Sequence, residues 1–93
     1  MASPIAELLA TEAAIDKLGA RDISIDEAQQ VPRNTHVMVR NRHDWDATRR
    51  LLIGRTHGGR ALTPVIEQTI DPTTWLIVTG WEAAAGERRL LDG

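Results

Sequence analysis

The chain has 93 residues, 42% of them hydrophobic, and a formal net charge of −2; this length predicts a single domain over residues 1–93. The absence of cysteine excludes disulfides, thiolate catalysis and cysteine-ligated zinc. The sequence contains neither a basic N-terminal stretch followed by a long apolar segment nor a run of about 18 apolar residues, so we expect a cytoplasmic protein that does not associate with a membrane.

The N-terminal segment predicts a first helix. Ser3 can cap this helix, and Pro4 fits its first position, where the missing N–H costs nothing. Apolar residues recur at helical spacing as far as Leu18, and Gly19 can end the helix.

A second, short helix is predicted after residue 23. Ser24 and Glu27 have the spacing of a capping box, in which each side chain bonds the other residue's backbone N–H. Ile23 stands where a hydrophobic staple would lie, and Pro32 is expected to end the helix.

Beyond residue 33 the pattern changes from helical spacing to alternation and apolar runs. The segment "HGG" at 57–59 predicts a hairpin turn, and "DPTT" at 71–74 predicts another turn. Pro64 lies inside an apolar run, so we expect a bulge or a sheet edge there. The last run is almost wholly apolar and is expected at the centre of the sheet. The predicted strands are residues 36–40, 50–56, 60–69 and 75–81.

The Ala, Glu, Arg and Leu content of residues 82–91 predicts a last helix, which Gly86 weakens. Strands that follow one another through tight turns form an antiparallel meander, and helices then cover it. The sequence therefore predicts an α+β domain with two N-terminal helices, a four-stranded antiparallel meander sheet and a C-terminal helix.

Positive charge is concentrated in the middle of the chain. Residues 33–60 carry seven arginines against two aspartates, and all three histidines lie in the same block. Arginine has the planar fork that suits phosphate and carboxylate. The block can therefore form a surface for a polyanion, or its arginines can face solvent and pair with acids of the flanking segments.

Three segments carry a resemblance to a known family: "IAELLATEAAIDKLGARDISIDEAQQV", "RLLIGRTHGGRAL" and "WLIVTGWEAAAGERR". In this order they resemble the BrnT-like toxins of bacterial type II toxin–antitoxin pairs, within the RelE-like ribonuclease superfamily. In that family the first helix ends in a basic-His-Gly-Val segment before Ser/Thr-x-x-Glu, and here Arg21-Asp22 stand where the basic-His pair is usual. Trp81 stands where a second functional arginine is usual, whereas Arg55 matches a functional arginine.

The resemblance implies the toxin of a toxin–antitoxin pair. Such a protein is a metal-independent endoribonuclease that cleaves RNA, needs no cofactor and forms a hetero-oligomer with its cognate antitoxin. The alternative is a catalytically degenerate RNA-binding or protein-binding module on the same fold. A small structural domain, whose arginines only pair with acids, is a third interpretation.

Metal-free RNA cleavage needs a proton carrier and a cation that stabilises the charged phosphate. Arg55, at a strand end near two glycines, is predicted to bind phosphate, unless it pairs with Glu67 or another acid across the hairpin. His57 is the predicted acid or base, unless it is only an exposed turn residue. Arg60 completes the predicted catalytic set.

An aromatic ring among arginines predicts RNA binding, because the ring can stack a base while the cations hold phosphates. Trp45 could instead pack under its loop in a core that lacks Phe and Tyr. The histidine spacing fits no metal motif, so no metal site is predicted. The predicted RNA-binding residues are Arg40, Arg42, Trp45, Arg49 and Arg50. The nuclease prediction requires that the arginines between residues 40 and 60 converge beside the hairpin.

Overall fold

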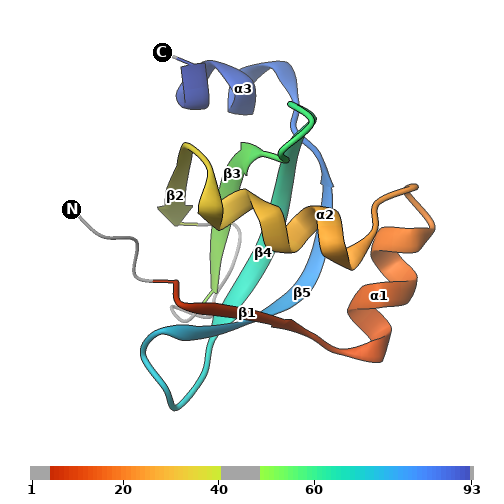
Figure 1. The fold of residues 1–93 in the computed structure, drawn as a ribbon, viewed down its shortest axis with the longest axis vertical. Coiled ribbons are helices and arrows are strands. Elements are labelled where there is room, and N and C mark those ends of the chain that lie inside the picture. The colour runs from red at the N-terminus through yellow and green to blue at the C-terminus, as the bar shows by residue number, and fades with distance from the viewer. Residues whose placement is uncertain (1–4, 41–48, 93) are drawn as a thin grey trace.

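One mixed sheet of five strands organises the computed structural model, which describes residues 5–40 and 49–92 (Figure 1). The strands lie in the order β1-β5-β4-β3-β2. The elements are β1 (Glu7–Ala10), α1 (Glu12–Gly19), α2 (Ile25–Gln30), the 3₁₀ turn η1 (Val31–Arg33), β2 (His36–Arg40), β3 (Arg49–Arg55), β4 (Ala61–Gln68), β5 (Thr74–Glu82) and α3 (Ala85–Asp92). The α+β class is therefore confirmed.

The predicted first helix is wrong over its N-terminal half. Residues Glu7–Ala10 form the edge strand β1, which runs parallel to β5, and the helix begins only after Thr11. The Thr11 side chain accepts a hydrogen bond from the Ala14 N–H at 3.1 Å, so it is the N-cap of α1. The proposed cap, Ser3, and the following Pro4 lie outside the described residues.

The second predicted helix is confirmed together with its cap. Ser24 Oγ accepts from the Glu27 N–H at 3.0 Å, and Glu27 Oε1 accepts from the Ser24 N–H at 3.1 Å. Ile23 is buried, as a hydrophobic staple requires. Pro32 lies in η1, immediately after α2, so it ends the helix where the sequence predicts.

The antiparallel meander is confirmed for β2 to β5, but the sheet has β1 as a fifth strand. The middle strand is β4, so the expectation that residues 75–81 form the centre is wrong; β5 lies between β1 and β4. Pro64 therefore lies in the middle strand and not at an edge. The expected bulge is present beside it, because the register with β5 shifts between Val65 and Ile66.

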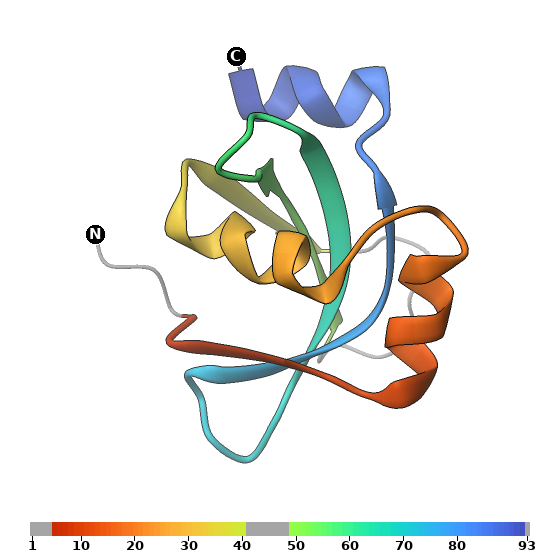
Figure 2. The same cartoon turned by 45° about the vertical axis from the view of Figure 1, so that its right-hand side comes forward.

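The helices pack against different parts of the sheet: in Figure 2, α2 lies in front of the strands, and α3 lies across the end of the sheet beside the β3–β4 hairpin. Leu52 and Leu62 belong to the main core together with Leu18 of α1, and we call this side the α1/α2 face. Alternate residues point the other way. There Thr63 Oγ1 donates to Glu87 Oε1 of α3 at 3.2 Å, and we call this side the α3 face.

The C-terminal helix is confirmed, but it begins later than predicted because β5 continues to Glu82. Glu87 Oε1 accepts from the Ala84 N–H at 2.8 Å and from Trp81 Nε1 at 3.1 Å, which fixes the start of α3 against β5. The predicted turn at 71–74 is also present, with Asp71 Oδ1 accepting from the Thr73 N–H at 2.9 Å. Among the described residues, no helix has the length and apolar character needed to span a membrane.

Asp22 adopts a left-handed backbone, with φ of 59°. Side chains other than glycine are strained in this region, so we expect Asp22→Gly to raise the free energy of unfolding by about 0.5–1 kcal/mol. The backbone oxygen of Asp22, which accepts from Arg60, is kept in this variant. Urea denaturation measures the change.

The matched control is Asp16→Gly within α1, where glycine is expected to lower the free energy of unfolding by about 0.3 kcal/mol. A loss of stability in both variants would contradict the assigned backbone at Asp22.

Candidate functional site

The three residues predicted as catalytic lie at the tip of the β3–β4 hairpin. Arg55 ends β3, His57 lies in the turn and Arg60 precedes β4. The turn is closed by the Thr56 N–H, which donates to the Arg60 carbonyl at 2.9 Å, and by Thr56 Oγ1, which accepts from the Arg60 N–H at 3.1 Å. Gly59 supplies a positive φ of 92°. The hairpin turn that the segment 57–59 predicts is therefore present.

Arg60 is bound to two carboxylates. Its Nε lies 3.0 Å from Glu82 Oε1, and its guanidinium lies 3.2 Å from both oxygens of Glu27. It also donates to the Asp22 carbonyl at 2.8 Å. These contacts raise the pKa of Arg60 further, with the Glu82 hydrogen bond as the largest cause. Arg60 therefore fastens the hairpin tip to α2 and β5, and a phosphate would have to displace two acids to reach it.

Arg55 is paired with the last residue of α3. Its NH2 group donates to both carboxylate oxygens of Asp92, at 3.1 and 2.9 Å, and its NH1 group donates to the Gly59 carbonyl at 3.0 Å. The alternative prediction, that Arg55 pairs with an acid, is correct, but the acid is Asp92 of α3 and not Glu67 across the hairpin. Glu67 pairs with Arg49 at 3.1 Å. A carboxylate of the chain itself therefore occupies the place predicted for a phosphate, and one terminal nitrogen of the guanidinium holds both of its oxygens.

His57 is exposed at the hairpin tip. Its Nδ1 lies 3.1 Å from the side-chain amide nitrogen of Asn34, and its backbone N–H donates to Gln30 Oε1 at 2.9 Å. The Asn34 amide also donates to the Arg55 carbonyl at 3.0 Å. These bonds join the hairpin tip to the segment that follows α2.

The described arginines of the central block do not converge. Arg55 contacts α3, whereas Arg60 contacts α2, so their side chains lie on opposite faces of the sheet. Residues alternate between faces along a strand, so Arg49 shares the α3 face with Arg55 and Arg50 points to the other face. The prediction of a single cluster of cations is therefore wrong for these four residues.

The described members of the predicted RNA-binding set lie at the end of β2 and at the start of β3. Arg49 is paired with Glu67, and Arg50 donates to the Arg49 carbonyl at 2.8 Å. Arg40 is exposed at the end of β2, opposite Arg50 in the register. Arg42 and Trp45 lie outside the described residues.

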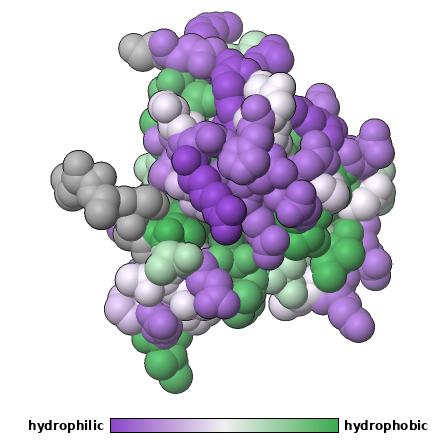
Figure 3. Space-filling model, in the orientation of Figure 1, coloured by the Kyte–Doolittle hydropathy of each residue, from purple (hydrophilic) through white to green (hydrophobic). Residues whose placement is uncertain are grey.

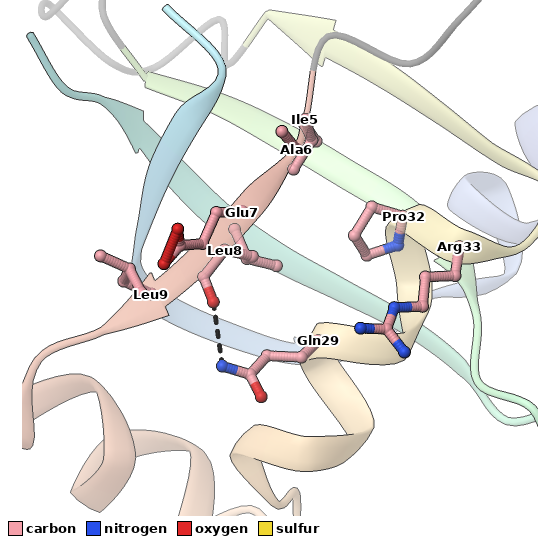
Figure 4. Close-up of a pocket in the computed structure, with 8 residues that line it drawn as sticks. All are labelled: Ile5, Ala6, Glu7, Leu8, Leu9, Gln29, Pro32 and Arg33. Carbon is pink, nitrogen blue, oxygen red and sulfur yellow. Dashed lines mark hydrogen bonds between the residues drawn. The ribbon is translucent and has the colours of Figure 1, made fainter. Parts of the chain in front are cut away.

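Two of the hollows in the described part of the chain adjoin the predicted site or β1. One, of about 290 Å³, is next to the Arg55–Asp92 pair and is lined by Asn34, Thr35 and Thr56 as well. The other, of about 240 Å³, follows β1 and is lined opposite the strand by side chains of α2 and η1 (Figure 4). Sequence reasoning missed this groove, because it exists only when residues 7–10 form a strand. Within residues 5–40 and 49–92, no three acidic or histidine side chains are grouped as metal ligands.

Comparison with known proteins gives no match, whether with protein-family models, with curated proteins or with solved structures. Inference of function therefore depends on the geometry just described.

The pH dependence of stability in a Glu27 variant tests the contacts between Glu27 and Arg60. The Ser24 N–H, and then Arg60, lower the pKa of Glu27. Because this pKa is lower in the folded state than in the unfolded state, the carboxylate stabilises the fold at any pH above its unfolded pKa of about 4.3. This stabilisation is lost as the pH falls through the lower pKa of the folded state. We expect Glu27→Gln to remove about 0.5–1 kcal/mol of stability at pH 7, after allowance for solvent screening.

The same variant should lose less stability than the wild type between pH 5 and pH 3. Thermal unfolding followed by circular dichroism across this range measures the difference. Equal losses in the two proteins would show that Glu27 is not held by these contacts.

Proposed function

We propose that the chain is a protein-binding module, catalytically degenerate relative to the ribonuclease toxins that its sequence resembles. The observation that carries the proposal is the pairing of the central arginines. Arg49, Arg55 and Arg60 each form an ion pair within the chain, and the last two lie on opposite faces of the sheet. Cleavage of RNA needs a cation that is available to stabilise the charged phosphate, and RNA binding needs cations that are available to several phosphates.

The positions that depart from the toxin pattern support the same proposal. The positive φ of Asp22 is the conformation that a glycine supplies, so Asp22 corresponds better to the glycine of the basic-His-Gly-Val segment, and Arg21 to its histidine. Arginine stays charged and is a poor acid or base. Arg21 NH1 donates to the Gly80 carbonyl at 3.2 Å, so the altered residue contacts the segment in which Trp81 replaces the second arginine.

A metal-independent endoribonuclease is the second candidate, favoured by one specific observation. Arg55 lines the hollow of about 290 Å³. His57 follows two residues later, with its Nδ1 3.1 Å from the side-chain nitrogen of Asn34, which also lines that hollow. The Arg55–Asp92 pair is partly exposed, with 38% and 57% of the two side chains accessible. RNA could therefore compete with Asp92 for the guanidinium.

RNA cleavage by the purified full chain separates the two candidates. We expect total RNA to stay intact with the wild type and with Asp92→Asn, the variant that releases Arg55. Cleavage by either protein, abolished by a further Arg55→Gln substitution, would establish the nuclease instead.

The binding proposal has its own test. The chain is co-expressed with the product of the adjacent reading frame, the expected position of a cognate antitoxin, and the complex is sought by size-exclusion chromatography with light scattering. We expect a stable hetero-oligomer. A chain that stays alone but binds RNA with a steep salt dependence would overturn the protein-binding proposal.

A further inference from the structure

The outer edge of β1 borders a groove of about 240 Å³. Residues 5–9 form one side of this groove, and Gln29, Pro32 and Arg33 form the other (Figure 4). Figure 3 shows apolar surface at the height of β1, below the polar side chains of α2. The groove thus combines a strand edge, apolar side chains and one cation.

Within the described sheet, β1 is an edge strand that pairs only with β5. The carbonyl of Leu8 points away from β5 and accepts a hydrogen bond from Gln29 Nε2 at 2.9 Å. A side-chain amide has the same donor chemistry as a backbone N–H. In the free chain, the side-chain amide of Gln29 therefore bonds the Leu8 carbonyl in the place where a backbone N–H of an added strand would bond it.

Arg33 gives the groove an unbalanced positive charge. Among the described residues, its guanidinium has neither an ion pair nor a hydrogen bond. Glu7 lines the groove through the strand, but its side chain points to the other side of β1, as does that of Leu9 (Figure 4). A ligand with a carboxylate opposite Arg33 would therefore complement the groove.

We propose that this groove binds an extended acidic peptide segment of a partner protein, which adds to β1 as a further strand. The backbone of the segment replaces Gln29 at the Leu8 carbonyl, and an Asp, a Glu or the C-terminal carboxylate of the segment pairs with Arg33. Strand addition draws affinity from main-chain hydrogen bonds and specificity from neighbouring side chains. Two copies paired through β1 would each bring an unbalanced Arg33, while Glu7, the acidic residue of β1, points to the other side of the strand (Figure 4), which favours a different chain as the partner. This inference rests on the proposed protein-binding function.

The test selects peptides from a random display library on the immobilised full chain and measures the affinity of the enriched peptides by fluorescence anisotropy. We expect extended sequences that carry an acidic residue or need a free C-terminus. Arg33→Gln should weaken their binding about fivefold, the effect of one exposed ion pair. Arg88→Gln, which removes an exposed arginine of α3, is the matched control and should bind as the wild type does.

Gln29→Ala distinguishes strand addition from a general effect of charge. The variant leaves the Leu8 carbonyl open, so the peptide no longer has to displace an internal hydrogen bond. We expect binding to tighten about 2- to 10-fold. Amide shifts of β1 residues on addition of the peptide, measured by nuclear magnetic resonance, locate the site.

The proposal is overturned if no acidic peptide is enriched, if Arg33→Gln and Arg88→Gln bind equally well, if Gln29→Ala weakens binding, or if the shifts lie on α3 or on β2. Self-association of the chain through β1 also overturns it. Any of these results, together with a stable complex with the product of the adjacent reading frame, would leave the protein-binding function in place and reject only this groove as its site.

Discussion

Replacement of Gly54 by alanine is expected to lower the free energy of unfolding by about 2–3 kcal/mol. A Cβ atom at this position would lie 2.6 Å from Val31 Cγ1 and 2.9 Å from His36 Cβ. Val31 is fully buried in η1, and the His36 Cβ is fixed to the backbone of β2, so neither atom belongs to a flexible side-chain end. The added methyl group therefore has to push η1 or β2 away from β3. Urea denaturation measures the loss.

Gly19→Ala is the matched control for this substitution. A Cβ at Gly19 has no atom within 4 Å, and alanine is the better helix former at the end of α1. We expect unchanged stability or a gain of up to about 1 kcal/mol. If both variants are as stable as the wild type, η1 does not pack against β3 as closely as the structure places it.

The sequence predicted correctly those elements whose signals lie within a few neighbouring residues. The capping box of α2 depends on Ser24 and Glu27, three residues apart, and the hairpin turn depends on Gly59, whose positive φ a glycine accepts without strain. The alternation of residues 36–40 needs only neighbouring side chains to be recognised. Each of these signals is complete within a few residues, so no knowledge of the rest of the fold is required.

The sequence analysis missed β1 because β5, the strand with which it pairs, is distant in the sequence. Leu8 pairs with Trp75 in a parallel register, and such pairing needs a long crossover that only the folded chain shows. The segment "ELLA" is short, and its two leucines fit the spacing of the following helix as well as that of a strand. Without β1, neither the start of α1 after its cap Thr11 nor the groove lined by Gln29 and Arg33 could be predicted.

The arginine block shows a similar limit. Strand bounds alone separate Arg49 from Arg50, because neighbours in a strand face opposite ways. The partners of Arg55 and Arg60 cannot be predicted from strand bounds. Asp92 reaches Arg55 only because α3 docks on the sheet, and Glu82 reaches Arg60 only because β5 pairs with β4. Composition indicated a cationic surface, and only the tertiary structure shows that acids from flanking segments neutralise much of it.

Ile77→Ala is expected to lower the free energy of unfolding by about 3 kcal/mol, within the range of about 2–5 kcal/mol for large-to-small core substitutions. Ile77 is fully buried in β5, opposite Ala10 of β1 and Ile66 of β4, so the lost methyl groups leave a cavity where both neighbouring strands meet the main core. Ile70→Ala makes the same chemical change at a fully exposed side chain and should cost less than about 0.5 kcal/mol. Urea denaturation of the two variants compares them directly. Because stabilities of small domains are about 5–15 kcal/mol, the first variant should show a clearly lower urea midpoint, and equal midpoints would mean that β5 does not lie between β1 and β4 in the folded protein.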